Sequence, residues 1–350
     1  MSDNAGWRGP RIAEIAKRAG VGSATVDRVL NNRGGVRGNT RDKVIAVLDQ
    51  LQIPLRSFSV PARKIGVISE AGRGFNRALK AAVERVDARM DNVDITFDGI
   101  TSSDFDAIRF GQQIERFARG VEGLMVVARE DMTVNRALRS VAAKKPIVCL
   151  TTDLPNSQRS AYVGNDQVSA GSTAAHLMGK FLPTRPSDVL LVISAPYRVQ
   201  QEREAGFRQV LRTSFPHLRI VERAQSNDDS IVSYEYLMSY LKKHEAPGGI
   251  YNVAGGSPGI GRAIREAGLR ERVLFIGHEL NDATREMLED GVMDVVIGHD
   301  VEREVVMAAS YLAAALAGQE APIPLPSSVL IHMRYNSMCF LVFDVFYIKW

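Results

Sequence analysis

The side chains between Arg11 and Asn32 have the types and the spacing that DNA binding requires. In the string RIAEIAKRAGVGSATVDRVLNN, Val26, Val29 and Leu30 fall on one face of a short predicted helix. The side chains that point outward from this helix are Ser23, Ala24, Asp27 and Arg28. A helix with a thin polar outer face can enter the major groove of DNA while its apolar face packs on a preceding helix. Two short helices joined by a glycine-containing turn on a basic background predict a helix-turn-helix.

The positive charge of the chain is concentrated at its beginning. Of the 44 Lys and Arg and 40 Asp and Glu in the chain, residues 1–56 contain 10 and 5, a charge of +5, and the remaining residues contain 34 and 35, a charge of −1. A local basic patch attracts the phosphate backbone of nucleic acid. The charge therefore agrees with the helix-turn-helix, although a basic segment without such a role is an alternative.

Three helices are needed to position these side chains. The spacing of apolar residues predicts helices at Ile12–Ala19, at about Ser23–Asn31, and from Asn39 or Thr40 to a stop at Pro54. We therefore expect a helical DNA-binding domain at 9–56. The next residues, 57–63, include Pro61 and lack periodicity, which is typical of a linker.

The rest of the chain alternates between apolar runs and amphipathic segments of helical length, which predicts an α/β fold with parallel sheets and helices on both faces. The predicted strands are Ile65–Ile68, Val93–Phe97, Gly123–Val127, Ile147–Leu150, Val189–Ile193, Arg219–Val221, Ile250–Val253, Val273–Ile276 and Val292–Ile297. The predicted helices include Phe75–Met90, Ala107–Ala118, Ser169–Phe181, Glu202–Leu211, Ser230–Lys243 and Pro258–Ala267. So long a segment exceeds one doubly wound core, and we expect two lobes with a cleft between them.

The first segment resembles the DNA-binding head of the lactose-repressor (LacI-type) family, whose pattern is DVAxxAGVSxxTVSRVLN. EIAKRAGVGSATVDRVLN fills nearly all of this pattern, and TRDKVIAVLDQL matches the third helix. The resemblance implies that Ser23 and Ala24 face base edges and that Arg28 binds guanine or phosphate. It also implies that Thr25, Asn31 and the backbone near Thr40 hold phosphates and set the register.

Three features depart from the family pattern. Gly22 and Asp27 stand where the family has serines. Asp27 would repel phosphate, so it either accepts from a base donor such as cytosine N4 or is held away from the DNA backbone by an ion pair. The linker is short, and its apolar residues either insert into the minor groove as a hinge helix does or form a plain tether.

The long segment resembles the sugar-binding regulatory domain of the same family, which shares its fold with periplasmic sugar receptors. The matching strings include TTDLPNSQRSAYVGNDQVSAG, QEREAGF, IYNVAGGSPGIGRAI and FIGHELNDATREMLEDG. The resemblance implies a two-lobed domain at 64–340, with a first lobe at about 64–162 and 298–330 and a second at about 163–297. The ligand residues that it implies are Phe75, Asn76, Asp153, Arg203, Asn252, His278, Glu279 and His299. An arginine fork suits vicinal hydroxyls or a carboxylate, and these residues follow strands, where such sheets bind ligands.

Other functional classes find little support in the sequence. The string GGSPGIG lacks the dinucleotide-binding pattern, the histidines lack metal-ligand spacing, and no nucleophile elbow is present, so we expect no cofactor and no metal. The two cysteines, Cys149 and Cys339, do not indicate an oxidising compartment. The polar start of the chain is not typical of a signal peptide and no run is long enough to span a membrane, so we expect a cytoplasmic protein. The apolar tail at 337–350 is unassigned.

These features predict a transcription regulator that is controlled by a small sugar or polyol, and we expect it to be a repressor. One head reads only a half-site, so we expect a homodimer on a pseudo-palindromic operator in double-stranded DNA. An α/β enzyme that processes a sugar and carries a basic head is one alternative. An extracytoplasmic sugar receptor is another.

Overall fold

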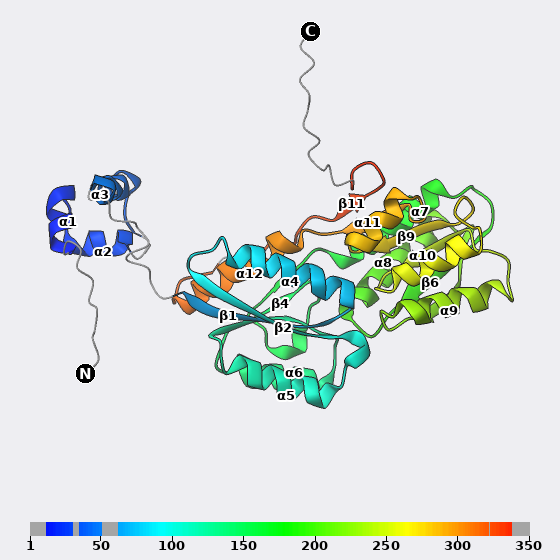
Figure 1. Cartoon of the computed structure of the whole chain (residues 1–350), viewed down its shortest axis with the longest axis horizontal. Coiled ribbons are helices and arrows are strands. Elements are labelled where there is room, and N and C mark those ends of the chain that lie inside the picture. The colour runs from blue at the N-terminus through cyan, green and yellow to red at the C-terminus, as the bar shows by residue number, and fades with distance from the viewer. Residues whose placement is uncertain (1–11, 31–34, 51–61, 322, 338–350) are drawn as a thin grey trace, which may run out of the picture. The chain divides into compact units, whose positions relative to one another are not determined.

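The computed structural model describes residues 12–30, 35–50, 62–321 and 323–337 and divides into two compact units, Met1–Arg63 and Lys64–Trp350 (Figure 1). We call the first unit the head and the second the body and describe each by itself. Most of the predicted linker and Asn31 lie outside the described residues. The alternatives of hinge helix and plain tether therefore stay predictions. None of the described helices is long and apolar enough to cross a membrane.

The head consists of three helices, α1 (Ile12–Ala19), α2 (Ser23–Leu30) and α3 (Gly38–Gln50). Gly20 in the turn between α1 and α2 has a φ of +65°, a conformation that glycine adopts without strain. The helix α3 begins at Gly38, earlier than expected, because the carbonyl of Arg37 accepts from the N–H groups of Thr40 and Arg41. The apolar faces of the three helices form one core: Ile15, Ala16, Ala19, Val26, Val29, Leu30, Val44, Val47 and Leu48.

The first lobe of the body is built on a five-stranded sheet in the order β2-β1-β3-β4-β5. Its strands are β1 (Arg63–Ala71), β2 (Val93–Thr101), β3 (Gly123–Val127), β4 (Ile147–Leu150) and β5 (Ala161–Val163). Its helices are α4 (Arg73–Asp87), α5 (Ala107–Ala118), α6 (Met132–Ala142) and the late α12 (Val301–Leu316). One core lies under α4 and α12 and another under α5 and α6, on opposite faces of the sheet (Figure 1).

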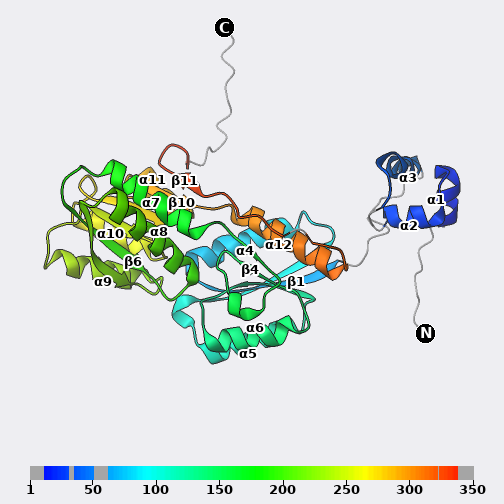
Figure 2. The same cartoon turned by 180° about the vertical axis from the view of Figure 1, so that it is seen from behind.

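The second lobe is built on a six-stranded sheet in the order β11-β10-β9-β8-β6-β7. Its strands are β6 (Ser187–Ile193), β7 (Leu218–Gln225), β8 (Gly249–Asn252), β9 (Leu274–His278), β10 (Val295–Gly298) and β11 (Leu330–His332). The helices α7 (Gln167–Phe181) and α8 (Arg198–Ser214) cover one face (Figure 2). The helices α9 (Ser230–Leu241), α10 (Ser257–Glu266) and α11 (Asp282–Glu289) cover the other.

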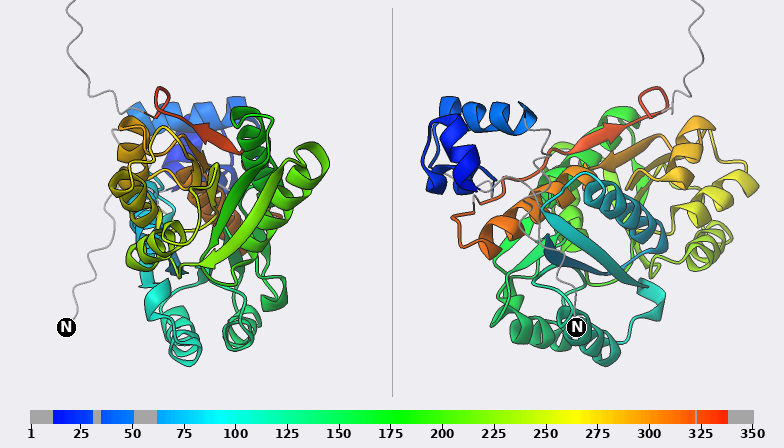
Figure 3. Two further views of the ribbon diagram at one scale, coloured as in Figure 1. Left: turned by 90° about the vertical axis from the view of Figure 1, so that its right-hand side faces the viewer. Right: turned by 60° about the vertical axis from the view of Figure 1, so that its left-hand side comes forward.

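The chain passes between the lobes three times, after β5, after β10 and after α12. The last passage brings β11 back to the second sheet, where it pairs antiparallel with β10 (Figure 3). The pairings of β6 through β10 in this sheet are parallel. The sequence predicts neither β5 nor β11, because a three-residue strand leaves too short an apolar run to recognise.

The helices α7 and α8 approach each other backbone to backbone through two glycines. A Cβ atom added at Gly171 would lie 1.9 Å from the carbonyl oxygen of Arg203, and one added at Gly206 would lie 2.1 Å from that of Val168. Only hydrogen fits at these positions. The contact therefore fixes the position of α8, which carries Arg203.

We predict that Gly206→Ala lowers the free energy of unfolding by about 1–3 kcal/mol or more, because the added methyl overpacks a backbone contact. The matched control is Gly111→Ala in α5, where the nearest atoms to an added Cβ lie 3.6 Å away. That change should be neutral or slightly stabilising, since alanine favours a helix. Chemical denaturation of both variants tests this, and equal stabilities would contradict it.

Candidate functional site

The outer face of α2 carries exposed and partly exposed side chains. Ser23, Ala24 and Arg28 are exposed, and Thr25 is partly exposed. Asp27 is also partly exposed and takes part in an interaction within the chain. The expected phosphate contact at Thr40 lies on the first turn of α3, where it is partly exposed. The residues predicted to read bases therefore share one surface, while DNA contact itself stays a prediction.

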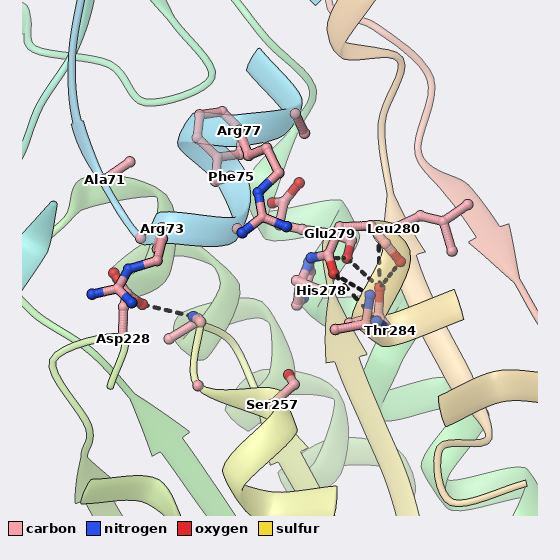
Figure 4. A pocket seen from close by; sticks show the side chains of 18 of the residues that line it. Ala71, Arg73, Phe75, Arg77, Asp228, Ser257, His278, Glu279, Leu280 and Thr284 are labelled. Atoms are coloured by element: carbon pink, nitrogen blue, oxygen red, sulfur yellow. Dashed lines mark hydrogen bonds between the residues drawn. The ribbon is translucent and has the colours of Figure 1, made fainter. Parts of the chain in front are cut away.

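The body contains a cavity of about 670 Å³ whose walls come from both lobes (Figure 4). It lies at the carboxyl ends of strands, the edge where parallel sheets bind ligands. Four of the eight expected ligand residues line it: Phe75, Arg203, His278 and Glu279. Phe75 comes from α4 of the first lobe, and its ring stacks on that of His299 with 6.4 Å between centroids.

The other four expected residues do not line the cavity, and neighbouring groups bind their polar atoms. The amide of Asn76 accepts from Ser69 at 2.6 Å and donates to the carbonyl of Ile100 at 2.7 Å. Asp153 forms an ion pair with Arg159. Both residues hold local structure together.

Asn252 and His299 are buried just behind the cavity wall. The amide nitrogen of Asn252 donates to the carbonyl of Gly255 at 3.0 Å and to the hydroxyl of Ser257 at 2.9 Å, which shapes the loop before α10. His299 follows β10 and lies between two carboxylates. Each of these two side chains supports a neighbour that faces the cavity.

Arg203, Glu279, His299 and Glu304 form a continuous row of charged side chains, the charge chain, in which Glu279 is partly exposed and the other three are buried. Arg203 Nη2 lies 2.9 Å from Glu279 Oε1, and Glu279 Oε2 lies 3.0 Å from His299 Nε2. His299 Nδ1 then lies 2.9 Å from Glu304 Oε1. Arg203 and Glu279 belong to the second lobe and Glu304 belongs to the first. His299 lies in the passage between them, so this charge chain connects the two lobes.

The two other passages between the lobes connect to the same charge chain. Gln167, at the start of α7, accepts from Arg203 Nε at 2.8 Å. The hydroxyl of Ser327, in the last passage, donates to Glu304. Three of the five N–H groups of the Arg203 guanidinium are therefore used, by Gln167, Glu279 and the carbonyl of Val253, and the other two have no partner among the residues that the structure describes.

The charged side chains of the charge chain shift one another's pKa values and so determine which of them are protonated. Burial alone would lower the pKa of His299, but the carboxylates of Glu304 and Glu279 outweigh burial and raise it to about 10. Burial would raise the pKa of Glu279, but His299 and Arg203 together hold it well below its usual range. His278, which donates to or accepts from the Tyr251 hydroxyl at 2.8 Å, has its pKa lowered, first by burial and then by Arg203. At neutral pH His299 is therefore charged and His278 is neutral.

Three residues that line the cavity adopt left-handed backbone conformations without being glycine. Thr151, Asp228 and Glu279 have φ values of 62°, 56° and 67°. Such conformations cost free energy and persist where surrounding contacts enforce them, often at functional sites. For Thr151 these contacts include a hydrogen bond from its hydroxyl to Glu304 at 3.3 Å.

Direct polar contacts join the lobes on the side of the cavity away from the charge chain. The hydroxyl of Tyr197, from the second lobe, binds Glu70 and lies 2.8 Å from the hydroxyl of Ser102 in the first. Ser102 also donates to Asp228 of the second lobe at 2.8 Å. Arg129 completes the cluster through an ion pair with Glu70 at 2.7 Å. We call these five residues the interlobe clasp.

The sequence does not predict the clasp, because the apolar runs of β1 and β7 end before the strands themselves do. Glu70 and Asp228 lie at or after the ends of β1 and β7, beyond the predicted ends at Ile68 and Val221. Tyr197 follows β6, and the rule that ligand residues follow strands would have found it. Cys149 is fully buried in the core under α5 and α6, and this burial raises its pKa to about 12. The described residues contain no group of His, Cys, Asp and Glu that could hold a metal ion.

Two family models match the chain. Residues 11–52 match "Bacterial regulatory proteins, lacI family", and residues 57–320 match "Periplasmic binding protein domain". The MalR regulator of Streptomyces coelicolor is 56% identical over 61 residues, which are 17% of this chain and 18% of that protein. The catabolite control protein A of Streptococcus mutans is 28% identical over 211 residues, 57% of this chain and 60% of that protein. The alignments with the first curated relatives thus cover only a fifth or so of those proteins, 18% for the S. lividans regulator reg1.

Solved structures resemble the body in fold. GanP, a glucose-galactose binding protein from Geobacillus stearothermophilus, superimposes with a TM-score of 0.70 at 19% identity over 79% of this chain and 98% of that one. A solute-binding protein from Burkholderia graminis in complex with D-arabinose gives 0.72 at 21% identity over 79% and 96%. The likeness to these two binding proteins establishes the fold of the body.

From the pKa of His299 we predict how the stability of the folded protein depends on pH. In the folded protein His299 has a pKa of about 10, whereas unfolded histidine titrates near ~6.5. The stabilisation from its charge is therefore complete below pH ~6.5 and declines as the pH rises to about 10, by at most about 1.4 kcal/mol per pH unit.

The measurement is the free energy of unfolding of the wild type and of His299→Gln between pH 6 and 10, at roughly the range set by these pKa values. The destabilisation caused by His299→Gln should be largest near the lower limit and shrink toward the upper one. A difference that does not change with pH would show that His299 is not charged in the fold.

Proposed function

The chain belongs to the lacI family of bacterial regulatory proteins, and we propose that it is a sequence-specific repressor of transcription whose affinity for its operator is controlled by a small sugar or polyol. The observation that carries this proposal is the combination of a LacI-type helix-turn-helix with a cavity lined from both lobes of a periplasmic-binding-protein fold. Relatives named as transcriptional regulators, including the sucrose operon repressor of Pediococcus pentosaceus, support the regulatory part.

Effector control requires a ligand that binds two states of the body with different affinities. Arg203 lines the cavity and is bonded to groups at the passages between the lobes. A ligand that binds the two remaining N–H groups of Arg203 therefore contacts the charge chain directly. Through Glu279 and His299 it favours one arrangement of the lobes over another.

The proposal extends to assembly, location and chemistry. One head contacts one half-site, so the regulator acts as a homodimer on a pseudo-palindromic operator. It acts in the cytoplasm, where its DNA is, and it binds its effector without converting it. In support of the last point, the cavity residues Arg203 and Glu279 neutralise each other in an ion pair rather than activating a nucleophile.

We predict that Arg28→Ala weakens binding to the operator by about 10- to 100-fold, the range expected for one bidentate contact to a base. Arg28→Lys is the matched variant, because lysine keeps the charge but lacks the planar fork. It should lose discrimination between operator and random DNA while keeping most of the salt dependence. Fluorescence anisotropy on an operator selected from random-sequence DNA measures both, and unchanged discrimination in either variant would remove Arg28 from base recognition.

For the effector, we predict that a sugar or polyol raises the melting temperature of the protein and shifts its affinity for the operator. Phe75→Leu should weaken that sugar about 3- to 10-fold, since an aromatic ring contributes about 0.5–1.5 kcal/mol beyond its area. Phe181→Leu is the control, because Phe181 is 47% exposed at the end of α7 and lies off the cavity. A sugar whose binding leaves operator affinity unchanged would contradict effector control.

A further inference from the structure

The cavity has an excess of arginine side chains at its rim. Five arginines line it: Arg73, Arg77, Arg85, Arg203 and Arg285. Arg203 is paired with Glu279 and Arg85 with Glu302, which leaves three. Arg73 and Arg77 are exposed and form no ion pair with any residue that the structure describes. Arg285 is half-buried and donates to the carbonyl of Ser337, which is uncharged.

The carboxylates of the cavity do not balance these three arginines. Glu279 is already held by Arg203 and His299. Both oxygens of Asp228 are occupied, by the hydroxyl of Ser102 and the N–H of Gly255. Burial also raises the pKa of Asp228, which disfavours its negative charge. Among the residues known to line the cavity, only Asp282 remains as a counter-charge.

The three arginines come from opposite walls that meet. Arg73 and Arg77 leave the first turns of α4 in the first lobe, and their side chains reach toward the second lobe (Figure 4). A Cβ atom added at Gly74 would lie 3.4 Å from the amide nitrogen of Asn281, the N-cap of α11. Arg285 lies on α11, one turn beyond Asn281. Like charges on two touching walls repel each other unless an anion lies between them.

The start of α4 adds further positive potential to the same wall. Gly72, its N-cap, provides no side-chain hydrogen bond to the first turn. The N-caps of α8 and α10, Tyr197 and Gly256, likewise provide none, whereas six other helices of the body have Asp or Asn N-caps that do accept such bonds: Asp106, Asp131, Asp166, Asp229, Asn281 and Asp300. Free N–H groups at a helix start favour an anion.

The floor of the cavity has a different chemistry from its rim. Its polar groups are neutral, including Thr152, Gln200 and Ser257, or neutralised, as in the pair of Arg203 and Glu279. Such groups suit the hydroxyls of a sugar, and Phe75 provides an aromatic face. An occupant that satisfies both zones has a hydroxylated part at the floor and a negative group at the rim.

We propose that the effector is an anionic sugar derivative, with a phosphate or carboxylate bound between Arg73, Arg77 and Arg285. This inference rests on the proposed function and narrows its ligand class. The negative group connects α4 of one lobe with α11 of the other, so it stabilises the contact of Gly74 with Asn281. A neutral sugar occupies the floor but leaves the three arginines unpaired.

Isothermal titration of the full-length protein with matched probes tests this inference. The neutral probes are glucose, galactose and arabinose. The anionic probes are glucose 6-phosphate, galactose 1-phosphate, arabinose 5-phosphate, glucuronate and galacturonate, together with inorganic phosphate alone. We expect at least one anionic sugar to bind about tenfold or more tighter than its neutral parent, the gain typical of hydrogen bonds to a charged group. Comparison of the affinities of the sugar phosphates with those of the uronates identifies whether the rim arginines prefer phosphate or carboxylate.

The double variant Arg73→Gln/Arg77→Gln should lose this anionic advantage while keeping its affinity for the neutral parent. Arg212→Gln is the matched control, because Arg212 is exposed in the last turn of α8 and lies off the cavity. The advantage should also shrink as salt concentration rises, since Arg73 and Arg77 are exposed to solvent.

The outcomes separate the inference from the proposed function. A neutral sugar that binds as tightly as its phosphate and uronate, and that releases the operator, overturns the anionic rim and leaves effector control standing. An anionic advantage that survives in Arg73→Gln/Arg77→Gln overturns the assignment to these arginines. Binding of none of the probes, inorganic phosphate included, counts against both.

Discussion

The doubly paired carboxylate of Glu279 is the constraint on which the rest of the body depends. It lies between Arg203 and His299, so removal of either cation would leave this carboxylate with one charged partner in place of two. Its backbone is left-handed, a conformation that the same contacts enforce. The partners of Glu279 reach the passages between the lobes. Ion pairs and hydrogen bonds therefore connect the cavity wall with these passages. A ligand cannot bind Arg203 without acting on these connections.

A backbone contact complements this electrostatic constraint. Gly171 and Gly206 bring α7 and α8 so close that α8 has little freedom to shift, and Arg203 is held along with it. On the other side of the cavity the interlobe clasp, centred on Tyr197 and Ser102, fixes a second point of contact between the lobes. Two polar connections at opposite sides of one cavity favour a body with few stable arrangements, as a two-state regulator requires.

The sequence predicts the parts of this molecule that rest on local periodicity. The head core, including Ile15, Val26 and Leu48, follows from helical spacing alone. The resemblance to a family then indicates Arg203 and Glu279, but it cannot show that Asn252 bonds its own loop or that Asp153 pairs with Arg159. Those outcomes depend on which nearby partner competes for each polar atom. The clasp as a unit could not be predicted for another reason, since its five members lie at or just after the ends of five strands, β1, β2, β3, β6 and β7, which are distant from one another in the sequence.

The order in which the chain emerges from the ribosome matters for this topology. The core of the first lobe is completed by Val305, Ala308 and Leu312 of α12, yet its last strand ends at Val163. The entire second-lobe sheet except β11 is synthesised in between. At roughly 5–20 residues per second of synthesis, the first lobe waits on the order of ten seconds with one apolar face covered by α4 but not yet by α12. During that interval the exposed apolar surface of the nascent first lobe can be bound by chaperones. The two lobes then complete their folding together rather than one after the other.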